Sequence, residues 1–185
     1  MSSDRVDDGV REARYRAVFA EVYPKLLAFA RRRADPAYVD DVVADTLLVA
    51  WRRLDEVPAG GELPWCYAVA RRCLANQQRS EARRLGLVQR LGATAVSTAG
   101  EAWESEDSGL NAAMADLPQE DRVVLELWAW EDLAPREIAT VLGISANAAS
   151  IRLHRAKRRL RSLLSDGKEP GAAGQRTGGH EREQR

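Results

Sequence analysis

Apolar residues return every three or four positions in several separate stretches of this chain, and no stretch shows the two-residue alternation of a β-strand. The first such stretch carries Tyr15, Val18, Val22, Leu26 and Phe29, which would share one side of a helix. Six further stretches have the same spacing, so the pattern predicts an all-α protein. Helices are expected at residues 15–30, 38–54, 65–85, 110–117, 118–128, 135–142 and 146–164.

Two segments lack this periodicity. Residues 86–109 are rich in Gly, Ala, Ser, Thr and Glu, a composition typical of a linker. Residues 166–185 contain few apolar side chains and many glycines, which indicates a disordered tail. The chain is therefore expected to form two small helical domains, residues 11–85 and 110–165, joined by a flexible linker.

The last two predicted helices meet at a turn with the chemistry of a helix-turn-helix. Gly143 suits a left-handed helix end, Ile144 would point inward, and Ser145 can cap the next helix. No acidic residue lies between Glu137 and Asp166. The second helix would bury a stripe of apolar residues at helical spacing, namely Ala149, Leu153, Ala156, Leu160 and Leu164. Its outward side is small at its start and basic further along. Its residues are Asn147, Ser150, Arg152, Arg155, Lys157, Arg158, Arg159 and Arg161. A plain helical hairpin with a solvated basic face is the alternative, but the three features together favour a helix that enters the DNA major groove.

Two of the earlier helices also carry charged faces, and each face has two interpretations. Residues 38–54 place Asp40, Asp41 and Asp45 on the exposed side and Arg52 near the end. This order stabilises the helix dipole, yet the same acidic face would suit a basic protein partner, and the stretch alone favours neither. In residues 65–85 one aromatic side chain, one amide and several arginines share one side of the helix. They are Trp65, Arg72, Asn76, Arg79 and Arg83. Such a surface can hold unstacked bases and phosphates, but this stretch taken alone favours a solvated basic helix with Trp65 half in the core.

Charge and composition limit the range of possible functions. The 28 basic and 28 acidic residues give zero net charge, whereas a protein that binds DNA unaided is usually basic. Local basic faces on a neutral chain indicate that the isolated chain binds DNA weakly. They also indicate that it acts together with a larger protein partner. Cys66 and Cys73 lie seven positions apart without further metal-ligating residues nearby, so we expect buried thiols, no metal and a reducing cytoplasm. Without a long apolar run we expect no membrane insertion.

Four segments in a fixed order resemble the extracytoplasmic-function (ECF) sigma factors, the bacterial initiation subunits of RNA polymerase. They are VDDVVADTLLVAWRRL (39–54), PWCYAVARRCLANQQR (64–79), DLPQEDRVVLEL (116–127) and REIATVLGISANAASIRLHRAKRRLR (136–161). The resemblance extends from about Tyr15 to Leu164. It implies that residues 11–85 are sigma region 2 and residues 110–165 are sigma region 4.

The resemblance also implies a role for each charged face. Asp40, Asp41, Asp45 and Arg52 match the polymerase-docking helix, and the loop 55–64 matches the loop that captures a flipped-out base. The minus-ten promoter element would be melted by Trp65, Arg72, Asn76, Arg79 and Arg83. The minus-thirty-five element would be read by Asn147, Ser150, Ile151, Arg152, His154 and Arg155. The implied partners are core RNA polymerase, promoter DNA and an anti-sigma factor, with no cofactor.

Three other classes of protein are alternatives to this interpretation. A stand-alone helix-turn-helix regulator would explain the C-terminal helices but has no need for the segment Val39–Arg79. A helical adaptor that never contacts DNA is a further alternative, and it would be favoured if charge reversal of Arg152 and Arg155 left promoter-driven transcription intact. An enzyme fits least, because the sequence shows no activated nucleophile, paired carboxylates or phosphate-binding glycine loop.

Overall fold

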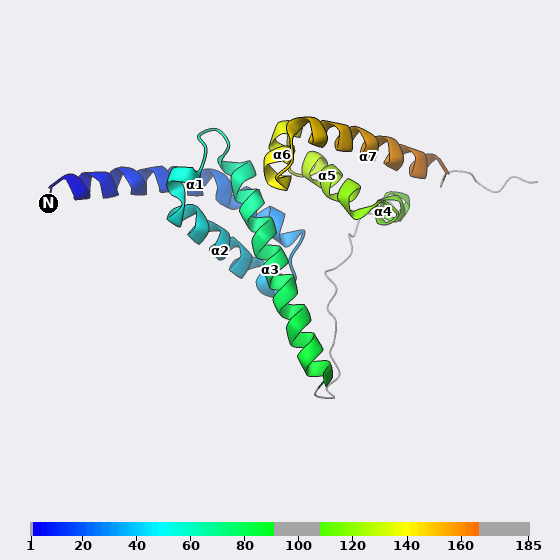
Figure 1. Ribbon diagram of the computed structural model, residues 1–185, viewed down its shortest axis with the longest axis horizontal. Helices are drawn as coiled ribbons and strands as arrows, with labels where there is room; N and C mark the ends of the chain where they lie inside the picture. Colours follow the sequence, from blue (N-terminus) through cyan, green and yellow to red (C-terminus); the bar gives the residue numbers. More distant parts are fainter. Residues whose placement is uncertain (1, 91–107, 167–185) are drawn as a thin grey trace, which may run out of the picture.

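The computed structural model describes residues 2–90 and 108–166, and in these ranges every regular element is a helix (Figure 1). The elements are α1 (Ser2–Arg31), η1 (Pro36–Tyr38), α2 (Val39–Arg52), η2 (Leu54–Glu56), α3 (Glu62–Arg90), α4 (Ser108–Ala115), α5 (Gln119–Ala129), α6 (Pro135–Leu142) and α7 (Ala146–Asp166). The all-α prediction is confirmed. Residues 91–107 of the predicted linker and 167–185 of the predicted tail lie outside the described residues.

Several predicted boundaries were wrong. α3 begins at Glu62 rather than Trp65, and α4 begins at Ser108, inside the predicted linker 86–109. α1 begins at Ser2, well before the apolar pattern starts at Tyr15, and α3 continues to Arg90 through the first five residues assigned to the linker. Extending a helix that has already formed fixes only one residue at a time, so helices continue into segments that carry no apolar stripe. The sequence pattern therefore marks the packed part of each helix rather than its full length.

The N-terminal bundle consists of α1, α2 and α3, and each of these helices packs against the other two. Phe29 and Tyr67 are fully buried at its centre, where their rings stack with centroids 4.5 Å apart. Thr46 is also fully buried, and its hydroxyl donates a 2.7 Å hydrogen bond to the carbonyl of Val42, so its polar group is satisfied. The remaining large core side chains are aliphatic, namely Val22, Leu26, Leu54 and Val57.

The C-terminal bundle contains α4 to α7, and the turn between α6 and α7 has the predicted chemistry. Gly143 ends α6 with a φ of 67°, the left-handed conformation that glycine adopts without strain. The Ser145 hydroxyl accepts a 3.1 Å hydrogen bond from the Ala148 N–H and so caps α7. α6 packs against α7, and Ile138 of α6 and Ala149 and Ala156 of α7 are completely buried in the same cluster. The two helices are therefore held as a helix-turn-helix.

The two bundles touch each other directly, which the sequence did not predict. α3 packs against α6, and the buried side chains of both bundles form one continuous cluster. Figure 1 shows α6 beside the first half of α3, with α5 and α7 extending away from that contact. Among the helices described, none is long and apolar enough to cross a membrane.

Candidate interfaces for nucleic acid and protein

The outer face of α7 is the candidate surface for duplex DNA. Asn147, Ser150, Ile151, His154 and Arg155 are exposed, and Arg152 is half-buried. Ala149, Leu153 and Ala156 form the opposite, buried side, as the helical spacing predicted. Leu164 was expected in the same buried stripe but is 37% exposed, because the end of α7 projects past its neighbours (Figure 1). The structure thus brings the six predicted residues onto one accessible side of a rigid helix.

Two acids at the start of α5 neutralise part of this basic face. Glu120 lies 3.2 Å from the Arg152 guanidinium, and the buried Asp121 carboxylate binds Arg159. These four side chains border a groove of about 1030 Å³ that Arg155 and Arg158 also line. Arg155 forms no ion pair with any acid in the described parts of the chain. Arg155 is therefore the predicted base-reading arginine whose charge is free for DNA.

Lys157 also differs from its predicted role as part of the open basic face. Its ammonium lies 3.2 Å from the centre of the Trp128 ring of α5, a cation–π contact. Trp128 remains 43% exposed in spite of this contact. The interaction ties α7 to α5, so Lys157 serves the packing of the bundle.

The second candidate nucleic-acid surface lies along α3. Arg72, Asn76, Arg79 and Arg83 are exposed, as predicted. Arg79 donates to the Asn76 amide oxygen at 2.5 Å and to the Ala75 carbonyl at 3.0 Å, so these two side chains are held together one turn apart. Trp65 is half-buried against the core, and the Arg53 guanidinium lies 5.9 Å from its ring centre. Only part of the Trp65 ring is available for stacking.

The candidate protein-docking face lies on α2. Asp40, Asp41, Asp45 and Arg52 are exposed, and none of them forms an ion pair within the described ranges. Between them the exposed side also carries apolar residues that the sequence analysis missed: Leu48 is 44% exposed and Trp51 is 38% exposed. The available signal was that both are large apolar residues outside the buried stripe of their helix.

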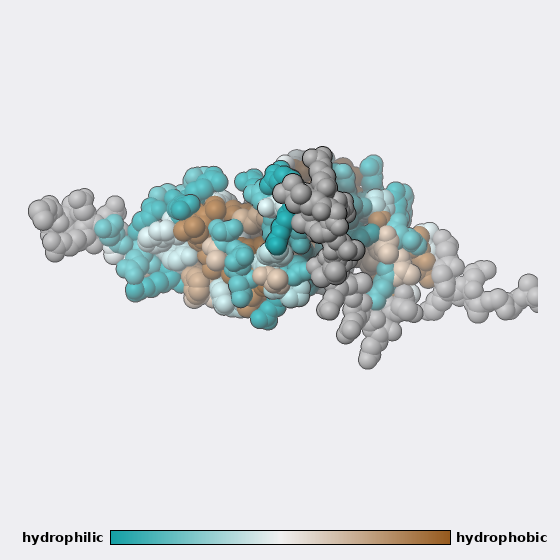
Figure 2. Space-filling view, turned by 90° about the horizontal axis from the view of Figure 1, so that it is seen from below, coloured by the Kyte–Doolittle hydropathy of each residue, from teal (hydrophilic) through white to brown (hydrophobic). Residues whose placement is uncertain are grey.

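Exposed aromatic side chains of α1 extend this apolar surface. Phe19 and Tyr23 are exposed and stack with ring centroids 5.1 Å apart, and Tyr15 meets Trp51 edge-on at 5.1 Å. Figure 2 shows hydrophobic atoms gathered over α1 and α2 on this side of the molecule. An apolar centre with charged residues around it is the usual anatomy of a protein–protein interface.

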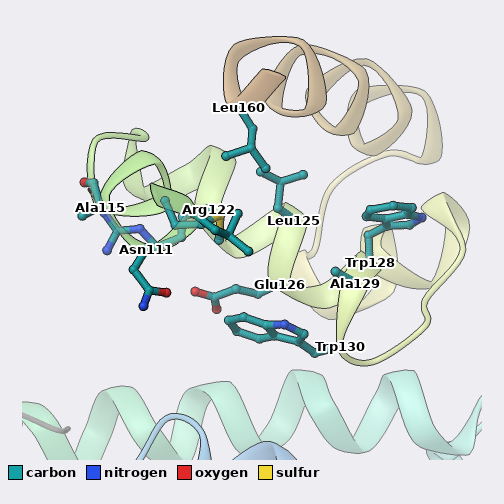
Figure 3. A pocket seen from close by; sticks show the side chains of 11 residues that line it. Asn111, Ala115, Arg122, Leu125, Glu126, Trp128, Ala129, Trp130 and Leu160 are labelled. Atoms are coloured by element: carbon teal, nitrogen blue, oxygen red, sulfur yellow. Dashed lines mark hydrogen bonds between the residues drawn. The ribbon is translucent and has the colours of Figure 1, made fainter. Parts of the chain in front are cut away.

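The C-terminal bundle has an apolar pocket of about 460 Å³ between α4, α5 and α7. Figure 3 shows Leu125 and Leu160 close to one another in its lining, which also includes Arg122, Trp128 and the neighbouring side chains of Glu126 and Trp130. Desolvation raises the pKa of Glu126, and the nearby Arg33 and Arg122 oppose that shift. The sequence pattern predicted these helices but not the pocket between them.

Possible metal ligands and the two thiols are the remaining chemical features of the described residues. No group of three or more His, Cys, Asp or Glu residues that would hold a metal is found within the described ranges. Burial raises the pKa of the Cys66 thiol to about 12, with a smaller contribution from Glu62, and burial also raises the pKa of Cys73. Both thiols are therefore protonated at neutral pH, and the protonated thiol is a poor nucleophile.

Sequence comparisons place the chain among known transcription proteins. A family model described as Sigma-70, region 4 matches residues 109–160. The ECF RNA polymerase sigma factor SigL of Mycobacterium tuberculosis is 33% identical over 157 residues, which cover 82% of this chain and 89% of SigL. The ECF RNA polymerase sigma factor EcfG of Rhodopseudomonas palustris is 31% identical over 146 residues, which cover 76% of this chain and 80% of EcfG.

Two solved structures have a similar fold. The sigma factor RpoE from Bartonella quintana, in complex with the anti-sigma factor NepR, matches with a TM-score of 0.60 and 23% identity, covering 82% of this chain and 96% of that one. CnrH in complex with the cytosolic domain of CnrY matches with a TM-score of 0.53 and 26% identity, covering 82% and 88%. The similarity therefore includes helices from both bundles.

Proposed function

This chain belongs to the ECF RNA polymerase sigma factors, a family of transcription initiation factors, and on that premise we propose that it directs core RNA polymerase to specific promoters. In this proposal the N-terminal bundle is sigma region 2, which docks on polymerase and opens the minus-ten element. The C-terminal bundle is sigma region 4, which reads the minus-thirty-five element in the duplex. Polymerase supplies the catalysis in the cytoplasm, and this chain supplies the recognition.

The observation that carries the proposal is the exposed face of α7 within the segment that matches Sigma-70, region 4. A rigid helix with small residues at its start and an unpaired arginine further along suits the major groove, where each base pair presents a distinct pattern of donors and acceptors. We assign base contacts to Ser150, Ile151, His154 and Arg155, with Asn147 at the entry to the groove. Arg152 joins them once DNA competes with Glu120 for its guanidinium.

We assign the opening of the minus-ten element to α3 and to the loop that precedes it. Arg72, Asn76, Arg79 and Arg83 offer donors to the phosphates and bases of a single strand along one exposed side. The exposed part of Trp65 lies in the first turn of this helix, next to residues 57–61, the non-helical part of the segment 55–64 in which a flipped-out base would be held. Such a pocket repays part of the energy needed to unstack a base.

We assign polymerase docking to the outer side of α2. Asp40, Asp41, Asp45 and Arg52 provide charge complementarity to a basic partner, while Leu48 and Trp51 supply apolar area at the centre. Charged groups at the rim of an interface mainly guide association, and buried aromatic side chains contribute most of the affinity. This division is consistent with a chain of zero net charge that depends on polymerase for tight DNA binding.

An anti-sigma factor is the proposed regulatory partner. The two solved relatives were crystallised with NepR and with the cytosolic domain of CnrY, respectively. In this chain the apolar pocket of the C-terminal bundle and the apolar surface of α1 and α2 both suit the amphipathic helices of such a partner. Its binding would compete with polymerase for the same surfaces.

Selection of binding sites from a randomised duplex pool tests the proposal against the stand-alone regulator. The pool is incubated with the chain alone, with core polymerase alone and with both together, at one salt concentration, because DNA affinity depends strongly on salt. The proposal predicts enrichment of a two-part sequence only when both are present. Tight enrichment of one sequence by the isolated chain would instead identify a stand-alone helix-turn-helix regulator.

A further inference from the structure

The part of α1 that precedes the core is attached to the rest of the N-terminal bundle mainly by polar contacts. None of residues 8–17 is buried, and Val18 is the first buried residue after them. A helical segment without a buried apolar side gains little stability from packing, so its polar contacts determine where it lies. Besides the half-buried Tyr15, two arginines one turn apart on the same side of α1 make these contacts. They are Arg11 and Arg14.

Arg11 binds the end of α2 and the short helix η2 that follows it. Its guanidinium donates to the Asp55 carboxylate at 2.9 Å and to the Trp51 carbonyl at 2.9 Å, with a different nitrogen for each. Its guanidinium carbon also lies 5.5 Å from the centre of the Trp51 ring, a cation–π contact. Because a guanidinium presents its donors in a rigid fork, Arg11 fixes α2 and η2 relative to α1 at the same time.

Arg14 holds the point at which the non-helical residues 57–61 begin. It donates a 2.7 Å hydrogen bond to the carbonyl of Val57, and the Val57 N–H donates to the Leu54 carbonyl at 3.2 Å. The Val57 side chain is only 2% exposed. Val57 is therefore fixed through its carbonyl, its N–H and its side chain.

The residues after Val57 form a tight turn that leads into α3 (Figure 1). The Gly61 N–H donates to the Pro58 carbonyl at 3.1 Å, and Gly60 has a φ of 71°, the left-handed conformation that glycine adopts without strain. The Trp65 N–H donates to the Gly61 carbonyl at 3.1 Å and so connects the turn to the first turn of α3. Residues 58–60 are exposed. The turn is thus open to a ligand while both of its ends are fixed.

We propose that Arg11 and Arg14 are positioning residues for base selection: from α1 they hold the turn 58–61 in the shape that receives the flipped-out base of the minus-ten element. This role rests on the function proposed above. A loop that is ordered before binding loses less conformational entropy when it binds. A site of fixed shape also discriminates between similar ligands better than a mobile loop, which can adapt to several. The two arginines therefore act on the choice of base without contacting DNA.

Hydrogen exchange of the full chain, followed by mass spectrometry, measures the attachment of the turn to α1 in the absence of DNA. The double variant Arg11→Ala with Arg14→Ala loses hydrogen bonds from charged donors, so the amides of residues 57–61 should exchange about tenfold faster. Exchange in α7 should stay as in the wild type. Arg16→Ala is the matched control, because Arg16 also lies exposed on α1 but pairs only with Glu12 of the same helix, and it should leave exchange at 57–61 unchanged.

Base selection is measured by transcription with core polymerase and each variant. The templates are the promoter that the wild-type chain selects from a randomised library and derivatives of it with single base changes in the minus-ten element. The double variant should lose about tenfold in preference at one or two adjacent positions and keep its preference at the others. Arg16→Ala should retain the wild-type preference at every position. A general loss of stability would lower transcription without singling out particular positions.

Three results would overturn the proposal. Unchanged exchange at 57–61 in a folded double variant would show that α1 does not hold the turn. Faster exchange with an unchanged base preference, or with an equal loss at every position, would show that the attachment does not serve base selection. Arg14→Ala alone replaces the double variant if circular dichroism shows that variant to be unfolded. If exchange responds as expected but the wild-type chain directs no promoter-dependent transcription, the proposed function fails and the attachment of the turn to α1 stands.

Discussion

Replacing Arg155 with alanine is the sharpest test of how α7 reads DNA. The Arg155 side chain is exposed and forms no ion pair in the described ranges, so its removal should change the free energy of unfolding by no more than about 0.5 kcal/mol. A bidentate contact between arginine and a base is worth about 1–3 kcal/mol of discrimination. We therefore expect a loss of about 5- to 150-fold in the use of a promoter with an intact minus-thirty-five element.

The structure also predicts a smaller effect for the neighbouring Arg152→Ala. Arg152 must leave Glu120, 3.2 Å away, before it can contact DNA, and an exposed pair of this kind is worth about 0.2–1 kcal/mol. That cost offsets part of the energy that Arg152 would gain from DNA. Arg155 has no such cost, so Arg155→Ala should be the more damaging of the two.

The assay is competitive in vitro transcription by core polymerase and each variant on two promoters that differ only in the minus-thirty-five element, intact or scrambled. Arg155→Ala should reduce transcription from the intact promoter and leave the scrambled one almost unchanged. Arg161→Ala removes the same charge from an exposed position nearer the end of α7, and it should leave the preference between the promoters intact. Equal losses on both promoters for Arg155→Ala would refute base reading at this position.

Three further outcomes are expected. Asp41→Arg with Asp45→Arg reverses the exposed acidic face of α2 and should weaken pull-down of core polymerase without changing the circular dichroism spectrum; normal recovery of polymerase would contradict the docking assignment. Ile138→Ala removes a fully buried side chain and should lower the free energy of unfolding by about 2–5 kcal/mol in urea melts, whereas the exposed Thr140→Ala should stay within about 0.5 kcal/mol. The pKa of Cys66 is raised from 9.0 to about 12, so the unfolded chain loses this proton first and stability should fall as pH rises above 9; an equally steep fall in Cys66→Ala would count against this cause.

Local chemistry was enough to predict the helix-turn-helix. The left-handed end at Gly143 and the cap at Ser145 depend only on neighbouring backbone groups, so short-range rules reach them. Helical spacing likewise identified Ala149, Leu153 and Ala156 as the buried side of α7. These features are set within a few residues of one another along the chain.

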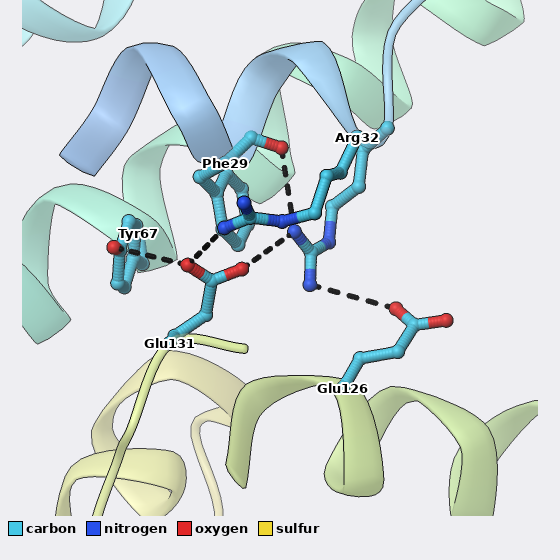
Figure 4. Close-up of polar contacts among 6 residues, drawn as sticks. Phe29, Arg32, Tyr67, Glu126 and Glu131 are labelled. Atoms are coloured by element: carbon cyan, nitrogen blue, oxygen red, sulfur yellow. Dashed lines mark hydrogen bonds and ion pairs between the residues drawn. The ribbon is translucent and has the colours of Figure 1, made fainter. Parts of the chain in front are cut away.

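The same short-range rules could not predict contacts between segments that are distant in the sequence. Periodicity tells which side of a helix is buried but not which helix covers it, so the packing of α3 against α6 was not predicted. The pair Glu120–Arg152 and the contact of Glu131 with Arg33 join residues that lie far apart in the sequence. These pairs change the roles of single residues: Arg152 is partly neutralised by Glu120, and Arg33 joins the two bundles through Glu131 (Figure 4).

Run-off transcription by core polymerase over a randomised promoter library, with and without this chain, tests the central claim most directly. The account predicts that transcripts appear only when the chain is present and that they come from templates sharing two sequence elements at a fixed separation. Transcripts that are independent of the chain, or that show no shared elements, would contradict the assignment of this protein as a promoter-specific initiation factor.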